Sequence, residues 1–205
     1  MPDRPSRRFR LTVAYGWVPG HELLRHEAAR FHGVPASSIV LEHECPSCGS
    51  STHGRPQIVP IAALRAPAHV SLARAGGLSV VALTDAGPVG VDVEPAGAAD
   101  FDGFDDVALH PDERGAPGDR TRSWVRKEAL LKATGTGLSV DPREVRLDRT
   151  RVAAGDVHHG TSAPWWMRDV DVAGHVAAVA VLLAQEDADI DVSVSPGPQG
   201  PATST

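Results

Sequence analysis

The stretch Gly90-Val91-Asp92-Val93-Glu94 alternates apolar and acidic side chains, which is the pattern of a β-strand with one buried face. Side chains two residues apart lie on the same face of a strand, so Val91 and Val93 are expected in a core, and Asp92 and Glu94 on the other face. A second apolar run at 78–83 (LSVVAL) precedes it, and the short connection between the two runs is typical of a hairpin. The centre of the chain therefore predicts two neighbouring strands.

A helix is predicted over residues 121–134 and ends at a glycine, a residue common just after a helix C-terminus. It carries Trp124, Glu128 and Lys132 at spacings of four, so these side chains share one helical face. Lys127 lies on a different face. These two lysines are the only ones in the protein, against 18 arginines. Because an ammonium and a guanidinium differ in shape and hydration, this choice of lysine indicates a chemical role.

The other periodic segments are short and mostly strand-like. One helix is predicted over 21–31, and strands over 39–41, 69–72, 145–147, 165–170 and 175–183. Residues 1–10 are expected to be loose, residues 45–60 to be loop, and residues 186–205 to form a disordered tail for lack of apolar side chains. Strands that precede and follow single helices indicate an α+β fold with mostly antiparallel sheet. Since the pattern repeats loosely, we expect two halves, 1–88 and 89–185.

Composition excludes several classes of function. At 205 residues the chain can bury a core of its own, and its hydrophobic content of 41% is ordinary for a globular protein. A net charge of −6 gives no electrostatic case for binding nucleic acid or membranes. No apolar run approaches the roughly 20 residues of a membrane span, and no secretory signal is visible at the start. We therefore expect a cytoplasmic protein.

Cys45 and Cys48 form a single Cys-x-x-Cys motif. With His43 and His53 they could complete a four-ligand zinc site. A zinc ribbon normally carries a second cysteine pair, which this chain lacks. A loop with two reduced thiols is therefore the favoured interpretation.

The central motifs suggest a cation site. Two neighbouring carboxylates, Asp92 and Glu94, repel one another, and Mg²⁺ suits them because it binds carboxylate, phosphate and water oxygens. Glu128 can supply a third oxygen, and Lys132 a positive charge for a phosphate bound to the same cation. Taken alone, the acidic pair would be an exposed strand face, and Glu128–Lys132 a surface pair worth about 0.2–0.5 kcal/mol. Lys127 is either a second phosphate contact or a solvated side chain.

The order of the motifs is more specific than any one of them. The chain contains His53-Gly54-Arg55-Pro56, Gly90-Val91-Asp92-Val93-Glu94, Trp124-x-x-Lys127-Glu128-x-x-x-Lys132 and Gly135-x-Gly137-Leu138. This combination resembles the 4′-phosphopantetheinyl transferases, specifically the longer type that activates peptide and polyketide synthases, over about His53 to Leu183. The resemblance implies that family's fold: two pseudo-symmetric halves, each with a mostly antiparallel sheet packed on a helix, in a monomer.

The resemblance also implies a reaction. The phosphopantetheine arm of coenzyme A moves to a serine of an acyl or peptidyl carrier protein, with Mg²⁺ as cofactor, and 3′,5′-ADP leaves. By resemblance, Asp92, Glu94 and Glu128 are the metal ligands. Glu128, or a metal-bound water, is the candidate base for the serine proton, and Lys132 holds the phosphate. Asp92 and Lys132 also count among the contacts to coenzyme A.

Further coenzyme A contacts are expected by resemblance in the first half. Arg55 would contact the nucleotide end. The family's strand usually ends Ser-His, where this chain has Ala73 and Arg74. Arg74 can still bind phosphate bidentately, whereas Ala73 cannot replace a hydroxyl.

Four other residues complete the expected site with less support. The family usually has about one more strand and helix ahead of the matched segment, so the first half is expected to be shortened. Arg10 and Arg25 are its nearest basic candidates for the 3′-phosphate, Glu113 falls where the family has a glutamate near the site, and Lys127 is the possible second phosphate contact. The arginines at 120–126 are a candidate patch for docking the carrier protein, and the bland alternative is a solvated helix start.

Two other functions compete with an active transferase. A degenerate member that binds coenzyme A or a carrier protein without turnover is suggested by Ala73 and the short first half. A Mg²⁺-dependent phosphohydrolase could use the same acidic cluster, although no dedicated water-activating histidine lies near Asp92 in the sequence.

Overall fold

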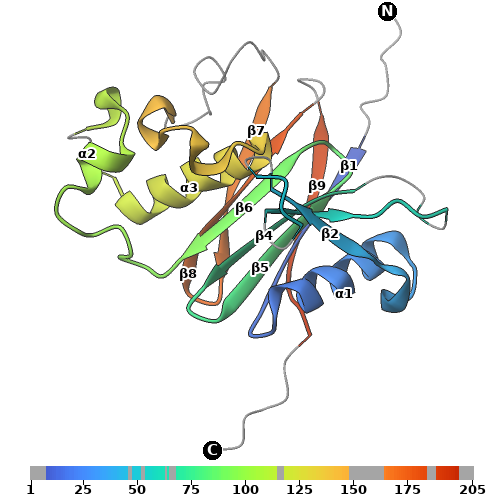
Figure 1. Ribbon diagram of the computed structural model, residues 1–205. Helices are drawn as coiled ribbons and strands as arrows, with labels where there is room; N and C mark the ends of the chain where they lie inside the picture. Colours follow the sequence, from blue (N-terminus) through green and yellow to red (C-terminus); the bar gives the residue numbers. More distant parts are fainter. Residues whose placement is uncertain are drawn as a thin grey trace, which may run out of the picture.

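Two β-sheets pack face to face, and each carries one long helix on its outer face (Figure 1). The computed structural model describes residues 8–45, 48–51, 54–62, 64, 68–114, 118–147, 164–183 and 188–198. No helix within these ranges is long and apolar enough to cross a membrane.

The first sheet has the strand order β4-β5-β1-β9. These strands are β1 (Arg8–Gly16), β4 (His69–Ala75), β5 (Leu78–Thr84) and β9 (Asp189–Pro196). Helix α1 (Gly20–His32) covers the outer face with an apolar stripe that includes Leu24 and Ala28, which pack with Val81. A separate hairpin of β2 (Leu41–Glu44) and β3 (Arg55–Ile58) packs against the same apolar cluster.

The second sheet has the order β6-β8-β7, and helix α3 lies on its outer face. Its elements are β6 (Val89–Glu94), β7 (Trp165–Val172), β8 (His175–Leu182) and α3 (Arg120–Thr134). Between β6 and α3 lie the short helix α2 (Phe104–Ala108) and the 3₁₀ turn η2 (Pro111–Glu113). The further 3₁₀ turns are η1 (Ala36–Ser38), η3 (Gly137–Ser139) and η4 (Pro142–Glu144).

The two halves repeat one arrangement. A strand, a helix and an antiparallel hairpin follow one another as β1-α1-β4-β5 and again as β6-α3-β7-β8. In both sheets the first strand pairs with the last strand of its unit. Five of the six strand pairings among the described residues are antiparallel. The expected α+β fold with two pseudo-symmetric halves is therefore confirmed.

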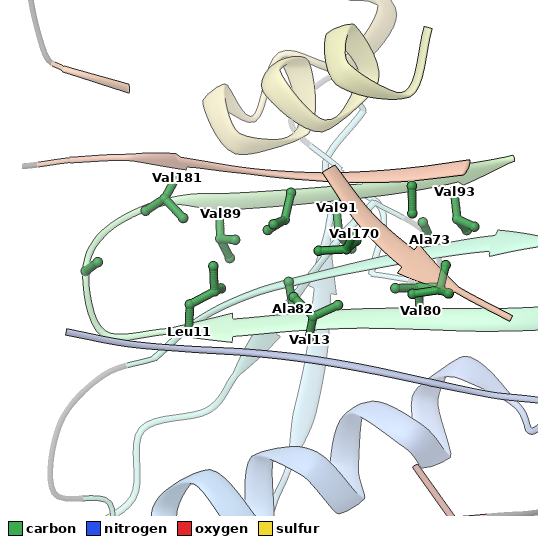
Figure 2. Close-up of a cluster of buried hydrophobic side chains, with 14 of the residues drawn as sticks. Leu11, Val13, Ala73, Val80, Ala82, Val89, Val91, Val93, Val170 and Val181 are labelled. Carbon is green, nitrogen blue, oxygen red and sulfur yellow. The ribbon is translucent and has the colours of Figure 1, made fainter. Parts of the chain in front are cut away.

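The main core lies between the two sheets and is aliphatic. Figure 2 shows the valines of β6, Val89, Val91 and Val93, facing side chains of the first sheet such as Val13 and Val80, with a helix on the far side of β6. All five are at most 1% exposed. The predicted division of the central strand into a valine face and an acidic face is correct for the valines.

The connection at 84–88 is not a hairpin. It carries the chain from one sheet to the other, since β5 pairs with β4 and β1, whereas β6 pairs with β8. The two sheets meet at β4 and β6, where the backbone N–H of Val91 donates to Ser71 Oγ at 3.1 Å. The division at residue 88 falls on this passage, and as a domain boundary it stays a prediction.

Both ends of the described chain contain strands that the sequence analysis missed. β1 begins at Arg8, within the segment expected to be loose, and β9 occupies 189–196, within the expected disordered tail. The tail prediction is wrong for β9 because Ile190 and Val192 pack on the inter-sheet core while the backbone pairs in parallel with β1. β1 and α1 also supply a strand and a helix ahead of the matched segment.

Two smaller predictions also fail. Residues 55–58 form β3 instead of loop, and residues 145–147 contain only an isolated bridge at Leu147.

Candidate functional site

The site is built where β6 passes under helix α3. Gly90 makes the approach possible, because a Cβ at this position would overlap the carbonyl oxygen of Ala129 and lie 2.5 Å from the backbone nitrogen of Ala133. The neighbouring strand β8 presents Ala178 and Ala180, which are also small, to the same helix. Asp92 and Glu94 follow Gly90 on the same strand face, so their carboxylates rise beside the helix.

Lys132 and Asp92 form the closest contact of the site. Lys132 Nζ donates to Asp92 Oδ1 at 2.5 Å, and the two side chains are 31% and 8% exposed. Burial raises the pKa of Asp92, while the charge of Lys132 and its hydrogen bond act to lower it. The predicted partnership of Lys132 with the acidic strand is therefore present, as a direct ion pair.

Glu94 and Glu128 complete a cluster of three carboxyl groups. Burial is the main cause that raises the pKa of both groups, and each feels the negative charge of Asp92. Asp92 Oδ2 and Glu128 Oε1 are buried and have no hydrogen-bond partner within the described structure. Two orphaned oxygens and mutual repulsion are what a bound cation would relieve.

The donor set fits Mg²⁺ in its chemistry. The three groups offer oxygen ligands only, with two of the oxygens buried and unpartnered, and a phosphate could complete the shell. As they stand, no three His, Cys, Asp or Glu side chains among the described ranges are grouped closely enough to hold a metal ion. The ammonium of Lys132 neutralises Asp92 instead. The metal site at these residues therefore stays a prediction.

Lys127 is neither solvated nor available to a phosphate. Its side chain is fully buried, and its ammonium contacts Glu113 Oε2 at 2.6 Å. The carboxylate of Glu113 therefore pairs with Lys127 and not with the groups of the carboxyl cluster. Both residues thus differ from their expected places, because α3 is covered on this side by other segments of the chain.

A basic cluster of His21, Arg25, His43 and Arg74 lies where α1, β2 and β4 come together. His21 Nε2 lies 2.9 Å from His43 Nε2, so one ring donates to the other. Burial lowers the pKa of His21 most, and the charges of His43, Arg74 and Arg25 lower it further. Arg74 is exposed and passes close to Gly20, where an added Cβ would lie 2.9 Å from its Nε. Arg25 and Arg74, which form no salt bridge with a carboxylate in the described part of the chain, favour the binding of a polyanion here.

The remaining basic candidates occupy different places. Arg55 on β3 is drawn toward the end of α3, where its Nη1 would be 3.6 Å from a Cβ at Gly135, and burial lowers its pKa. Arg10 lies at the other end of α1, with its guanidinium 4.3 Å from the ring centre of Phe31, and it also contacts Asp85. The 11 residue-to-residue steps from Gly20 to Phe31 span about 16 Å of helix, so Arg10 does not join the basic cluster.

Two other sequence expectations are resolved here. Ala73 is buried in the core between the sheets, on the face opposite to Arg74, so the place of the missing hydroxyl is filled by apolar packing. The arginines at 120–126 do not form an open docking patch. Arg120 pairs with Asp105, whereas Arg122 and Arg126 both pair with Asp169 on β7. His53, a candidate zinc ligand and part of one motif, lies outside the described residues.

An apolar cavity of about 660 Å³ opens beside the carboxyl cluster. Glu94 lies on its rim, and Trp124 forms a wall by packing edge-on against Phe104 with ring centres 6.3 Å apart. Phe101 and Leu138 line it and are 50% and 63% exposed. The carboxyl groups thus lie against an apolar recess that is open to solvent.

The sequence analysis missed the two histidines of the basic cluster and the walls of this cavity. The sequence pattern could have indicated His21, because this residue lies four positions before Arg25 and therefore on the same helical face. His43 and the cavity were not, since a strand from another hairpin and the 95–109 segment reach these places only through tertiary folding.

Comparison with known proteins identifies one segment of the chain. Residues 88–180 match the model of the 4′-phosphopantetheinyl transferase superfamily. No curated protein sequence matches the chain. The matched segment contains β6, α3, β7 and most of β8, and it includes all three carboxyl groups and Lys132. Over residues 88–180 the chain is thus similar to the 4′-phosphopantetheinyl transferase superfamily.

Proposed function

We propose that this protein transfers the 4′-phosphopantetheine group of coenzyme A to a serine of an apo carrier protein. The observation that carries the proposal is the set of three carboxyl groups of Asp92, Glu94 and Glu128 beside Lys132, with two buried oxygens that have no partner in the described structure, within the segment that matches the superfamily. Following the resemblance to the longer type, we propose carrier domains of peptide or polyketide synthases as acceptors. We also propose a cytoplasmic monomer.

Coenzyme A would lie across both halves. The basic cluster of His21, Arg25 and Arg74 suits the phosphates of the nucleotide end, and Arg55 points from β3 toward the last turn of α3. Lys132 lies in that last turn, where it is paired with Asp92, and it would donate to the diphosphate. These donors would bring the diphosphate beside the three carboxyl groups.

Transfer requires a proton acceptor and stabilisation of the leaving group. The serine hydroxyl attacks the phosphorus that carries pantetheine, and the bond from this phosphorus to the bridging oxygen breaks to release 3′,5′-ADP. Glu128 would accept the serine proton, and its raised pKa makes it a better base than an ordinary carboxylate. Lys132 would stabilise the negative charge that grows on the diphosphate. Mg²⁺ held by Asp92, Glu94 and Glu128 would supply further charge neutralisation there.

A mass assay tests this proposal. Incubation of the protein with coenzyme A, Mg²⁺ and an apo carrier protein is expected to add one phosphopantetheine mass to the carrier. Removing the divalent cation with a chelator should stop the reaction. Intact-protein mass spectrometry measures both results, and an unchanged mass with several carrier proteins and folded enzyme would overturn the proposal.

Replacing Arg74 with alanine is expected to weaken coenzyme A binding about 10- to 100-fold, because charge-assisted hydrogen bonds contribute about 1.5–3 kcal/mol each. Isothermal titration calorimetry provides the measurement. Arg8→Ala is the matched control, since Arg8 is exposed on β1 and paired with Asp189. An unchanged affinity in the Arg74 variant would remove this residue from the binding site.

A second candidate function is binding of coenzyme A or a carrier without transfer. Two observations favour it. Lys132 forms an ion pair with Asp92, and no three possible ligand side chains among the described residues are close enough together to hold a metal ion. Calorimetric binding of coenzyme A combined with an unchanged carrier mass would identify this function.

A further inference from the structure

Lys127 and Glu113 form a buried polar junction that connects several segments of the chain. Its side chain is completely buried on α3, and Nζ donates to the carbonyl oxygens of Ala108 at 2.8 Å and Pro142 at 3.0 Å, besides the ion pair with Glu113. All three donor positions of the ammonium are thus used. One side chain joins α3 to the end of α2, to η2 and to η4.

Glu113 extends the junction with its own two oxygens. Oε2 accepts from the backbone N–H of His110 at 2.8 Å, and Oε1 accepts from the backbone N–H of Leu147 at 2.7 Å. The carboxylate therefore closes the η2 turn and ties the end of the 142–147 segment to it.

The joined segments are also walls of the apolar cavity. Ala108 and Pro142, whose carbonyls accept from Lys127, both line it, and Trp124 lines it one helical turn before Glu128. Lys127 is adjacent to Glu128 in the sequence. The junction therefore lies behind the cavity and beside the proposed base, away from the basic cluster on α1 and β4.

We infer that Lys127 and Glu113 are positioning residues that hold the walls of this cavity in place for the acceptor substrate. The inference rests on the proposed function, because the acceptor must approach the carboxyl cluster past Glu94 on the cavity rim. The pair controls turnover with the carrier protein and leaves coenzyme A binding unchanged.

Folding stability alone does not explain why the two buried residues are charged. Removing one partner of a buried pair leaves an uncompensated charge, whereas apolar replacement of both partners is often neutral or stabilising. Lys127→Met and Glu113→Leu are therefore each expected to lower the Tm by about 10 °C. The double variant K127M/E113L is expected to recover part of that Tm, because no charge is left unpaired although the backbone groups that bonded to the pair lose their partners.

The double variant separates positioning from folding. Measured below its Tm, where it is folded, it is expected to keep its Kd for coenzyme A within about threefold of the parent, a difference below about 0.7 kcal/mol. Its kcat/KM for the carrier should fall at least tenfold. Hydrogen exchange should show faster exchange at the amides of His110 and Leu147, which lose their acceptor. Arg122→Gln, an exposed side chain on the same helix, is the control and should leave all three quantities unchanged.

Each outcome decides the inference. Full recovery of kcat/KM together with Tm would overturn it, as would unchanged exchange at both amides. A loss of coenzyme A affinity as large as the loss of turnover would also overturn it. If the parent protein transfers nothing to any carrier, the proposed function fails, and the exchange rates still show whether the pair holds the cavity walls.

Discussion

Replacing Glu128 with glutamine is expected to lower phosphopantetheine transfer at least about 100-fold, the usual contribution of a general base. Coenzyme A binding should stay within about threefold, since the basic cluster and Arg55 are untouched. The fold should remain, because the buried Oε1 of Glu128 has no partner to lose in the described structure, and the amide removes the repulsion from Asp92 and Glu94. Carrier mass spectrometry, calorimetry and thermal unfolding give the three measurements.

Glu144→Gln is the matched control for this variant. Glu144 is exposed on η4, so the same chemical change there should leave transfer at the parent rate. Parent-like transfer by the Glu128 variant would show that the serine proton goes elsewhere.

Replacing Gly90 with alanine is expected to destabilise the protein by at least about 3 kcal/mol, the upper range for overpacking a core. The added methyl group would meet the backbone of α3 at Ala129 and Ala133, and backbone in a packed helix cannot move aside as a side chain can. The strand and the helix would have to separate, and with them Asp92 and Glu128. Urea unfolding followed by circular dichroism measures the loss.

Gly103→Ala provides the comparison. Gly103 has a φ of +85° and no atom within 4 Å of an added Cβ, so alanine there costs only the strain of a left-handed residue, about 1–2 kcal/mol. If both variants lose the same stability, close packing of β6 on α3 is not the reason for glycine at position 90.

The central strand and helix were predictable because their signals are local. The alternation over 90–94 fixes which side chains of β6 enter the core, and the spacing of four places Glu128 and Lys132 on one face of α3. The structure adds that β6 and α3 pack together, so that Lys132 pairs with Asp92.

The two strands that the sequence analysis missed, β1 and β9, do show the apolar–polar alternation of a strand. Phe9, Leu11 and Val13 alternate with polar residues in β1, and Ile190 and Val192 alternate with aspartates in β9. A composition argument about polar chain ends hid both patterns. Two-residue periodicity is the better guide where polar composition and alternation disagree.

The roles of Lys127 and Glu113 could not be predicted from spacing. Helical periodicity predicts which residues share a face, but not whether that face meets solvent or another segment. Here α3 is covered by the sheet on one side and by the 108–113 and 142–147 segments on another. Contacts of that kind depend on tertiary folding alone.

The parallel pairing of β9 with β1 affects the order in which the two sheets can be completed during synthesis. Arg8 on the first strand pairs with Asp189 on the last, 181 positions later. At about 5–20 residues per second of synthesis, the ribosome completes β9 roughly 10–35 s after β1. The second sheet, whose strands lie between 89 and 182, can therefore form while the first sheet still has an open edge at β1. The segment with the carboxyl cluster would be assembled on the nascent chain before the first sheet gains its last strand.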